Sequence, residues 1–357
     1  MEVESTVACD VCFVTFPNYP TKNSGRGLDR YAYELIRGVG QQSGLDVRFV
    51  APRTNRTNYV IREIETALRL KQIDAKIYHA TSEYGLGSLI LARKRPIVVT
   101  IHDLLPRLFS RYSPLIYANQ RMHLLLAKHA DQVITTSNFY SSLLKQEFNI
   151  PAGQIDTIRY GVDHQRFRSK EGRRRGKIAR VLYLGGLNSL KGAKDLIEAF
   201  ARLCKSHEAQ LFIGGKGGYT RSLTELADNK GIAEKVSFLG FVEEEQLSDL
   251  YNSVDVLVWP SYFGFGLSTL EAMSCGTPVI GANCLDSQEY LGGASLLYSP
   301  GNVGELFEAL SILLYRQDSW ADWSGKALIW SENFSWRKMA DQVCSTYEKL
   351  GRNEYLH

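Results

Sequence analysis

The segment 260–280 combines residue types that suit a phosphate and a sugar. It starts at the end of a strand-like run, passes through a turn that contains Gly264 and Gly266, and enters a helix-like stretch. Glycine lets the backbone approach a ligand closely, and the free N–H groups at a helix start favour an anion such as phosphate. Glu271, about one turn into that helix, can accept hydrogen bonds from paired sugar hydroxyls. The plainer alternative is a strand–helix connection with an exposed glutamate.

The sequence lacks the residue patterns that usually bind a catalytic metal ion. The sequence has no Asp-x-Asp, and no cluster of His, Cys and carboxylates has metal-binding spacing. Cys9 and Cys12 form one Cys-x-x-Cys pair inside an apparent strand, without a second pair or a nearby histidine, which argues against zinc. We therefore expect no metal and no cofactor, and we expect the six cysteines to be free thiols.

The glycine-rich stretch 214–218 surrounds Lys216 and invites comparison with a P-loop. The Ser or Thr that should follow the lysine is missing, and the glycine spacing differs from that motif. We interpret the stretch as a strand-to-helix turn at the edge of a cleft.

The elements that must position these groups alternate in the manner of βα units around a parallel sheet. In the first half the expected strands are 7–16, 46–51, 75–79, 97–101 and 132–136, and the expected helices are 28–40, 57–71, 115–129 and 140–148. In the second half the expected strands are 180–184, 210–213, 236–239, 254–259, 278–280 and 295–297, with helices at 193–204, 219–230, 246–252 and 267–275. The pattern predicts an α/β protein with two doubly wound, Rossmann-like domains facing one cleft.

Between the two halves lies a stretch, 166–180, that is rich in Arg, Lys and Gly and ends near the run Arg173–Arg175. We interpret it as a solvated linker in preference to an anion site.

Composition and charge narrow the class of protein. The chain has 357 residues, of which 44% are hydrophobic and 22% charged, as expected for a globular protein of two domains. The net charge of +4 is too small to indicate a nucleic-acid partner. No apolar run approaches the roughly 20 residues of a membrane span, and the acidic N-terminus is unlike a signal peptide. We expect a cytoplasmic protein.

Residues 1–160 are mildly basic, with 20 Lys and Arg against 14 Asp and Glu, which suits an anionic partner such as a membrane or a phosphorylated acceptor. The segment 107–128 mixes basic and apolar side chains as an interfacial helix does. These are Arg107, Arg111, Arg121 and Lys128 with Leu108, Phe109, Leu115 and Ile116. Peripheral contact with the inner face of a membrane is one hypothesis, and a helix packed on the first domain is the ordinary alternative.

Six strings, in order along nearly the whole chain, resemble the pattern of glycosyltransferase family 4, retaining enzymes of the GT-B fold that use nucleotide-activated sugars. They are 99–103, 160–163, 182–200, 238–242, 260–280 and 334–336. The resemblance implies an acceptor-side domain over 1–160, a donor-binding domain over 161–335, and a C-terminal helix, 336–357, that crosses back to the first domain. It also implies catalysis without a metal, which agrees with the missing ligand patterns.

The resemblance implies roles for several side chains. Lys191 would face the diphosphate and stabilise the charge that develops on this leaving group. Glu271 would hold the ribose hydroxyls. His102, in its Ile-His-Asp context, would lie near the transferred sugar and position it, whereas His123 and His129 lack such a context and are predicted to lie on the surface.

Backbone contacts with the donor are implied as well. Gly266, Leu267 and Ser268 would offer N–H groups to the distal phosphate or sugar, Gly240 and Phe241 would meet the base, Gly27 would close over the phosphates, and Gly215 would lie near the donor.

Three positions depart from the family pattern. Phe263 stands where a glutamate contacts a hydroxyl of the transferred sugar, and Gly186 stands where an arginine commonly joins the lysine at the diphosphate. Tyr160 replaces the usual Asn before Gly-Val-Asp. We expect the first two changes to affect sugar identity and rate more than nucleotide binding.

The predicted function is transfer of a hexose from a UDP-, GDP- or ADP-sugar to a hydroxyl acceptor, which is a saccharide, a lipid-linked group or a small molecule. Two alternatives remain open. A nucleotide-sugar epimerase of the same fold would need acid–base carboxylates at the sugar, which we do not find. A catalytically weak nucleotide-sugar-binding protein would not need Lys191, Glu271 and His102 together.

Overall fold

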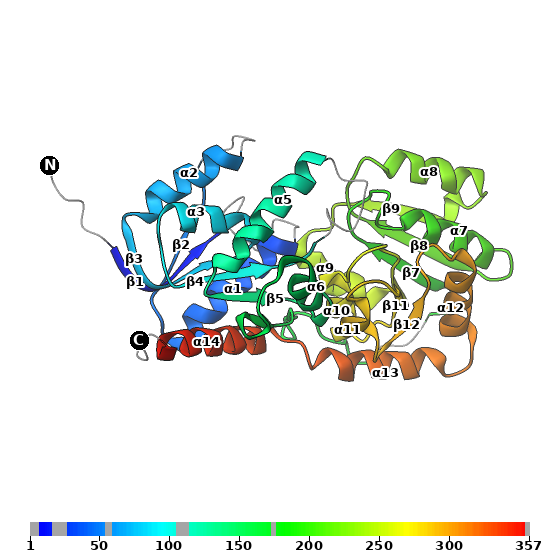
Figure 1. The fold of residues 1–357 in the computed structure, drawn as a ribbon. Coiled ribbons are helices and arrows are strands. Elements are labelled where there is room, and N and C mark those ends of the chain that lie inside the picture. Colours follow the sequence, from blue (N-terminus) through cyan, green and yellow to red (C-terminus); the bar gives the residue numbers. More distant parts are fainter. Residues whose placement is uncertain (1–6, 16–26, 54–58, 105–113, 173–175, 354–357) are drawn as a thin grey trace. The chain divides into compact units, whose positions relative to one another are not determined.

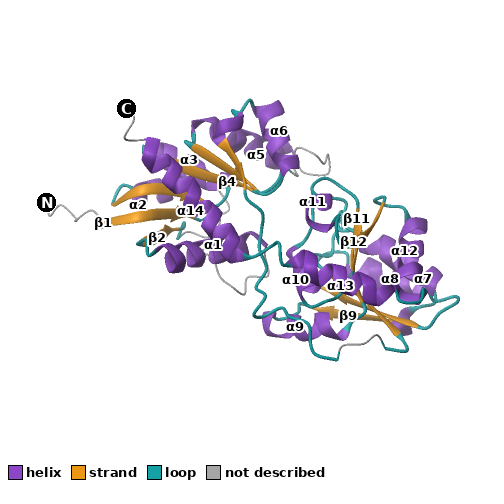
Figure 2. Ribbon diagram, turned by 90° about the horizontal axis from the view of Figure 1, so that it is seen from below, coloured by secondary structure: helices purple, strands orange, loops and turns teal. Residues whose placement is uncertain are grey.

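The computed structural model describes residues 7–15, 27–53, 59–104, 114–172 and 176–353. The chain forms two compact units, each built around one six-stranded sheet. One unit comprises residues 1–160 together with 336–357, and the other comprises residues 161–335. Figure 1 gives the elements of both units, and Figure 2 shows the strands of each unit enclosed between helices.

The sheet of the first unit is parallel throughout, in the order β2-β1-β3-β4-β5-β6. Its strands are β1 (Val7–Val14), β2 (Val47–Val50), β3 (Ile73–Ala80), β4 (Ile97–Ile101), β5 (Gln132–Thr135) and β6 (Ile155–Thr157). Every residue of β4 is buried, because helices cover both faces of a central parallel strand.

The described helices of this unit are α1 (Gly27–Ser43), α2 (Tyr59–Leu70), α3 (Leu86–Leu91), α5 (Pro114–Leu126), α6 (Asn138–Phe148) and α14 (Trp336–Asn353). Although the whole second unit separates them in sequence, α1 and α14 pack side by side. Helix α3 packs against both α2 and α5, so these three helices form one layer.

The sheet of the second unit is also parallel, in the order β12-β11-β10-β7-β8-β9. Its strands are β7 (Ala179–Leu184), β8 (Ala209–Gly214), β9 (Val236–Gly240), β10 (Val256–Trp259), β11 (Val279–Ala282) and β12 (Ser295–Tyr298). The chain runs outward from β7 to β9 and restarts at β10 on the other side of β7. Such a reversal leaves a crevice at the carboxyl ends of β7 and β10, where open sheets bind ligands.

The helices of the second unit are α7 (Ala193–Leu203), α8 (Thr220–Asn229), α9 (Glu244–Ser253), α10 (Leu267–Ser274), α11 (Ser287–Leu291), α12 (Val303–Tyr315) and α13 (Ser319–Ser331). Helix α10 packs against α9 and α13. Because of this packing, residues 269–274 are all buried, including the carboxylate of Glu271. A charged group in such a position needs a hydrogen-bonding partner.

The predicted α/β fold with two parallel sheets is confirmed, and the predicted strands and helices are found with ends that shift by a few residues. The strand β6 was not predicted because it has three residues, of which only Ile155 is buried. Helix α3 was missed because residues 86–89 are all buried and leave no polar face to give a helical period. Helices α11, α12 and α13 were missed as well.

The linker interpretation is wrong for Arg166, which is not solvated. Its guanidinium bonds the carboxylate and the main-chain oxygen of Glu244 and lies over the ring of Phe167. The run Arg173–Arg175 lies outside the described residues.

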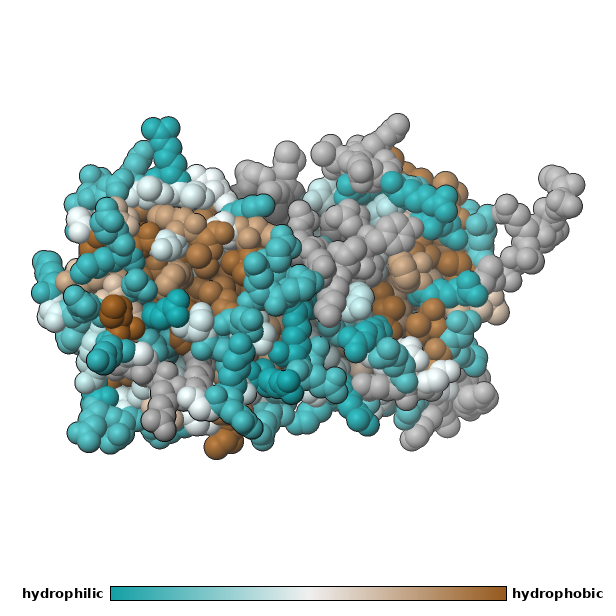
Figure 3. Space-filling model, turned by 180° about the vertical axis from the view of Figure 1, so that it is seen from behind, coloured by the Kyte–Doolittle hydropathy of each residue, from teal (hydrophilic) through white to brown (hydrophobic). Residues whose placement is uncertain are grey.

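Hydrophobic side chains reach the surface of both units in patches among hydrophilic ones (Figure 3). Among the described residues, no helix is long and apolar enough to cross a membrane.

Candidate functional site

The donor-side residues predicted from sequence gather at the carboxyl ends of four adjacent strands of the second unit, β10, β7, β8 and β9. Gly186 and Lys191 follow β7, Gly215 follows β8, Gly240 ends β9 with Phe241 after it, and Phe263, Gly266, Leu267, Ser268 and Glu271 follow β10. The fold thus brings together residues up to 85 positions apart in sequence, from Gly186 to Glu271.

Trp259, the last residue of β10, lies at the centre of this arrangement and is 4% exposed. Its indole N–H donates a hydrogen bond to the carbonyl of Gly264 at 3.1 Å, which fixes the ring. A Cβ atom at Gly266 would lie 2.6 Å from this ring, so only glycine fits there. The ring therefore holds the turn before α10 and, through close contact with Gly185, the turn after β7.

Lys191 places its ammonium over two aromatic rings. The Nζ atom lies 4.8 Å from the ring centre of Trp259 and 4.2 Å from that of Phe263. The loop that carries Lys191 is tied to the segment after β10, because the amide of Tyr262 donates to the carbonyl of Leu190 at 2.9 Å. Next to it, Gly192 has a φ of 69°, and a Cβ atom there would lie 1.9 Å from the carbonyl oxygen of Pro260.

The positive charge of Lys191 also acts to lower the pKa of the Cys284 thiol. Burial raises the pKa of the Cys284 thiol to about 12, and Lys191 is among the groups that oppose this rise.

The N-terminus of α10 meets the same turn. The first hydrogen bond of the helix runs from the amide of Thr269 to the carbonyl of Gly266, so the N–H groups of Leu267 and Ser268 precede the helical ladder. Backbone N–H groups at this place, together with the helix dipole, favour a phosphate. The Ser268 hydroxyl contacts the carbonyl of Leu184, at the end of β7.

Glu271 is 7% exposed, so the alternative of a solvated glutamate is wrong. Its Oε2 atom accepts a hydrogen bond of 2.7 Å from the hydroxyl of Tyr251, a residue of α9. A carboxylate has two oxygens that together accept several hydrogen bonds. A fixed carboxylate of this kind can accept bonds from paired hydroxyl groups.

The glycine-rich stretch after β8 is a turn, as predicted, and its Gly215 amide donates to the carbonyl of Gly240 at 2.6 Å. This bond joins the turns after β8 and β9. Lys216 lies with its ammonium 5.2 Å from the ring centre of Phe241, which is 37% exposed. Phe241 therefore presents an accessible aromatic face next to a cation.

In the first unit, His102 follows β4 and is 5% exposed. Its Nε2 atom lies 2.8 Å from the carbonyl oxygen of Thr81, which can only accept, so Nε2 carries the proton. Its Nδ1 atom then accepts from the hydroxyl of Tyr160 at 2.6 Å. Burial lowers the pKa of His102 to about 4, so the ring is neutral at pH 7.

The prediction that His123 lies on the surface is wrong. This side chain is 1% exposed, and its Nε2 atom lies 2.5 Å from Glu63. Burial lowers the pKa of His123, but hydrogen bonds to Glu63 and to the carbonyl of Asn119 raise it more, and the net shift is upward. His129 is exposed, as predicted. Gly27 is the first residue of α1, and its role stays a prediction.

Glu83 is a buried acid at the carboxyl end of the first sheet, close after β3. It accepts a hydrogen bond of 3.1 Å from the Gln120 amide, which also donates to the main-chain oxygen of Asp103. Burial and the charge of Asp103 raise the pKa of Glu83 to about 7.

Sequence reasoning missed Trp259, Tyr251 and Glu83, and it considered Lys216 only in the comparison with a P-loop. Trp259 could have been noticed as an aromatic residue at a strand end directly before the motif 260–280. Tyr251 gave no signal, because only the packing of α9 on α10 brings it to Glu271.

Two family models match this chain, one in each half. A family described as glycosyltransferase family 4 matches residues 25–166, and one described as glycosyl transferases group 1 matches residues 164–329. An O-antigen chain mannosyltransferase B of Escherichia coli is 27% identical over 80% of this chain and 77% of its own. A D-inositol 3-phosphate glycosyltransferase of Rhodococcus opacus is 30% identical over 74% of this chain and 66% of its own.

Solved structures agree in fold. The Anabaena protein HepE, crystallised with UDP and glucose, has a TM-score of 0.77 at 19% identity, covering 95% of this chain and 100% of its own. Sucrose-phosphate synthase from Thermosynechococcus elongatus has a TM-score of 0.81 at 20% identity, covering 96% and 100%. The fold is that of the GT-B glycosyltransferases. The chain belongs to the group 1 glycosyltransferases of family 4.

Replacing Lys191 tests its assignment to the leaving group. We expect Lys191→Ala to lower turnover at least tenfold, which corresponds to roughly 1.4 kcal/mol, because the charge that develops on the diphosphate loses its ammonium. Initial rates of the variant and the wild type, with unfolding curves for both, check this. Wild-type turnover in a folded variant contradicts the assignment.

The raised pKa of the buried Glu83 predicts how the stability of the protein changes with pH. The pKa of Glu83 in the folded protein, about 7, lies above the ordinary value of 4.5 for a glutamate, so the folded protein holds a proton that the unfolded chain loses between these two pH values. Glu83 therefore destabilises the fold increasingly as pH rises through this window. We expect Glu83→Gln to raise the midpoint of urea unfolding relative to the wild type at pH 8 by more than at pH 5. An equal difference at both pH values contradicts this.

Proposed function

We propose that the protein transfers a hexose from a nucleoside-diphosphate sugar to a hydroxyl acceptor, with retention at the anomeric carbon and without a metal ion. The observation that carries the proposal is the arrangement around Trp259. There an ammonium and the N-terminus of α10 meet one aromatic ring at the switch point of the sheet, and the same helix carries the fixed carboxylate of Glu271. This is a set of groups suited to a phosphate and to paired hydroxyls.

The reaction forms a bond between the acceptor oxygen and the anomeric carbon and breaks the bond from that carbon to the diphosphate. The products are a glycoside, a nucleoside diphosphate and a proton. Because negative charge grows on the departing diphosphate, Lys191 and the N–H groups of Leu267 and Ser268 stabilise the transition state more than the ground state. Glu271 binds the ribose hydroxyls and holds the donor in place.

The remaining carried-over roles belong to the same proposal. Gly240 and Phe241 meet the base, and Gly215 lies near the donor. Gly27 closes over the phosphates, and His102 positions the transferred sugar. Both ring nitrogens of His102 form hydrogen bonds, one to Thr81 and one to Tyr160. We therefore propose that the neutral ring positions the sugar by contact and does not act as an acid or a base.

The relatives do not select one donor. One is named a mannosyltransferase and another an inositol 3-phosphate glycosyltransferase, and a structural neighbour was solved with UDP and glucose. We therefore propose the class of nucleoside-diphosphate hexoses and a hydroxyl acceptor.

Product analysis with UDP-, GDP- and ADP-hexoses and a panel of hydroxyl acceptors tests the function. We expect one donor family to yield a glycoside with the anomeric configuration of the donor, at the same rate in excess chelator. A sugar isomerised on its nucleotide would indicate an epimerase, and binding without turnover would indicate a binding protein. Loss of activity in chelator that Mg²⁺ or Mn²⁺ restores would contradict metal independence.

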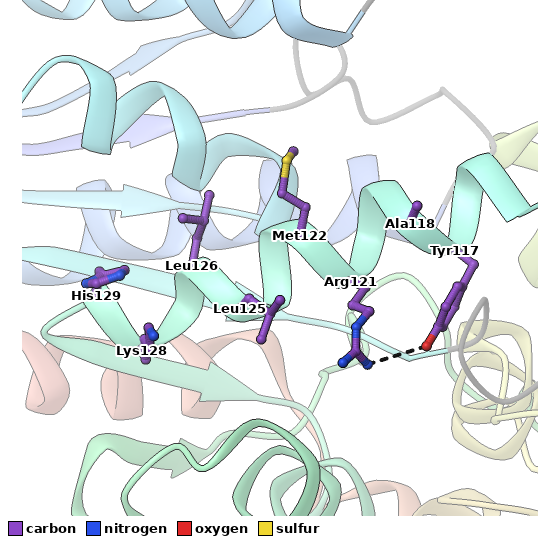
Figure 4. A pocket seen from close by; sticks show the side chains of 8 residues that line it. All are labelled: Tyr117, Ala118, Arg121, Met122, Leu125, Leu126, Lys128 and His129. Atoms are coloured by element: carbon purple, nitrogen blue, oxygen red, sulfur yellow. Dashed lines mark hydrogen bonds between the residues drawn. The ribbon is translucent and has the colours of Figure 1, made fainter.

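We also propose peripheral contact with an anionic membrane through the layer of α2, α3 and α5. Of the residues predicted for this role, Arg121 and Lys128 are described and exposed. Arg107, Leu108, Phe109 and Arg111 lie outside the described residues, as do the side chains of Leu115 and Ile116. Met122 and Leu125 are 45% and 46% exposed, and together with Arg121 and with Lys128, which lies in the turn after α5, they line a pocket (Figure 4).

Helix α2 adds an apolar stripe to this layer. Val60, Ile64 and Leu68 recur every four residues and are 58%, 48% and 59% exposed, whereas Glu63 and Thr66 are buried. An exposed stripe of this kind marks an interaction surface. The described side chains of α2, α3 and α5 include no fully exposed Asp or Glu, which suits an anionic partner.

Sedimentation with vesicles tests the membrane contact. We expect the protein to bind vesicles that contain phosphatidylglycerol and to bind neutral phosphatidylcholine vesicles less. The pair Ile64→Glu and Leu68→Glu should weaken this binding because both charges would enter the apolar stripe. Glu substitution at Ile329, an exposed residue of the second unit, is the matched control. Equal, negligible binding to both kinds of vesicle contradicts the proposal.

A further inference from the structure

Two positions near the lysine assigned to the diphosphate depart from the family pattern: Gly186 lies in the same loop after β7 as Lys191, and the ring of Phe263 lies against the ammonium. One removes a cation from that site, and the other replaces a carboxylate with an aromatic ring. In the structure the Phe263 ring is 9% exposed, and its centre lies 4.2 Å from the Lys191 ammonium. With Trp259 at 4.8 Å, it forms two walls of an aromatic cage for that ammonium.

An aromatic face and a carboxylate hold an ammonium in different ways. The ring attracts the cation through its quadrupole and leaves the net charge of the pair at +1. A carboxylate at the same distance would form an ion pair whose net charge is zero, and so would weaken the field that a bound phosphate meets. The choice of residue at position 263 therefore affects how much positive charge Lys191 presents.

We propose that Phe263 is a positioning residue for Lys191 and that its aromatic character compensates for the arginine missing at Gly186. Together with Trp259 it holds the ammonium in place without adding a negative charge beside it, at a position where the family pattern has a carboxylate. The inference rests on the proposed function, because it takes the diphosphate of the donor as the anion.

The structure allows the missing cation to be restored. A Cβ atom at Gly186 would have one neighbour within 4 Å, the Asn188 side chain at 3.9 Å. Gly186 is not among the residues with a positive φ, and its main-chain oxygen accepts a bond of 2.8 Å from Tyr183 that a side chain would not disturb. Gly186→Arg should therefore be accommodated without strain.

The experiment compares four proteins: the wild type, Phe263→Leu, Phe263→Glu, and Phe263→Glu combined with Gly186→Arg. Calorimetry gives the affinity of each for the nucleoside diphosphate and the monophosphate of the base that the wild type binds. We expect Phe263→Glu to weaken diphosphate binding at least about tenfold and to leave monophosphate binding within about twofold, because the new carboxylate pairs with Lys191. Phe263→Leu, which adds no charge, should weaken it by about two- to fivefold.

The double variant distinguishes the proposed role of Phe263 from a purely structural one. Adding Gly186→Arg to Phe263→Glu should restore most of the lost diphosphate affinity, since a second cation replaces the charge that the carboxylate removes. A purely structural role for Phe263 would weaken both nucleotides equally and would not be rescued. Unfolding curves confirm that each variant is folded, and Phe263→Leu provides the test if the glutamate variant is not.

Three results would overturn the inference. One is an unchanged diphosphate affinity in both single variants, and another is a failure of Gly186→Arg to rescue. The third is a change in the ratio of donor sugars without a change in diphosphate affinity, which is the result expected from sequence alone and would mean that Phe263 contacts the sugar. If the wild type binds no nucleoside diphosphate at all, the proposed function fails, and this outcome is distinct from all three.

Discussion

The contact of one aromatic ring with two backbone turns is the constraint on which the second unit depends. Trp259 ends β10 beside β7, and its ring packs against Gly185 and Gly266. A side chain at Gly266 would displace the ring, and without the ring the turn before α10 and the lysine loop would lose their common support. Lys191, the helix N-terminus and the turn after β7 therefore keep one arrangement because a single buried indole touches all of them.

A hydrogen-bonded network gives the first unit a comparable constraint. Thr100 on β4 joins His79 on β3 to Tyr31 on α1, and His79 also bonds the Tyr347 hydroxyl on α14 at 2.6 Å. Tyr31 lies edge-on to His102. The C-terminal helix is thus joined through buried polar groups to the strands that carry His102. Since buried polar groups are costly when unsatisfied, the loss of α14 would disturb this end of the sheet.

Sequence could predict the fold because both halves alternate short apolar runs with amphipathic stretches, and the run 97–101 coincides with β4. The resemblance to the family, together with glycines that mark the loops at the strand ends, predicted which residues lie on the donor side. Sequence could not predict the aromatic cage or the Tyr251–Glu271 bond, since these depend on how α9, α10 and the lysine loop pack. His123 was misjudged for the same reason: its partner Glu63 is 60 residues away, on another helix.

A crystal structure of the protein with a nucleoside diphosphate tests the central claim most directly. We predict that the diphosphate lies above Trp259, with the Lys191 ammonium and the amides of Leu267 and Ser268 within hydrogen-bonding distance of its oxygens and Glu271 bonded to the ribose. A diphosphate bound away from Trp259, or a Lys191 side chain directed away from it, would contradict the account.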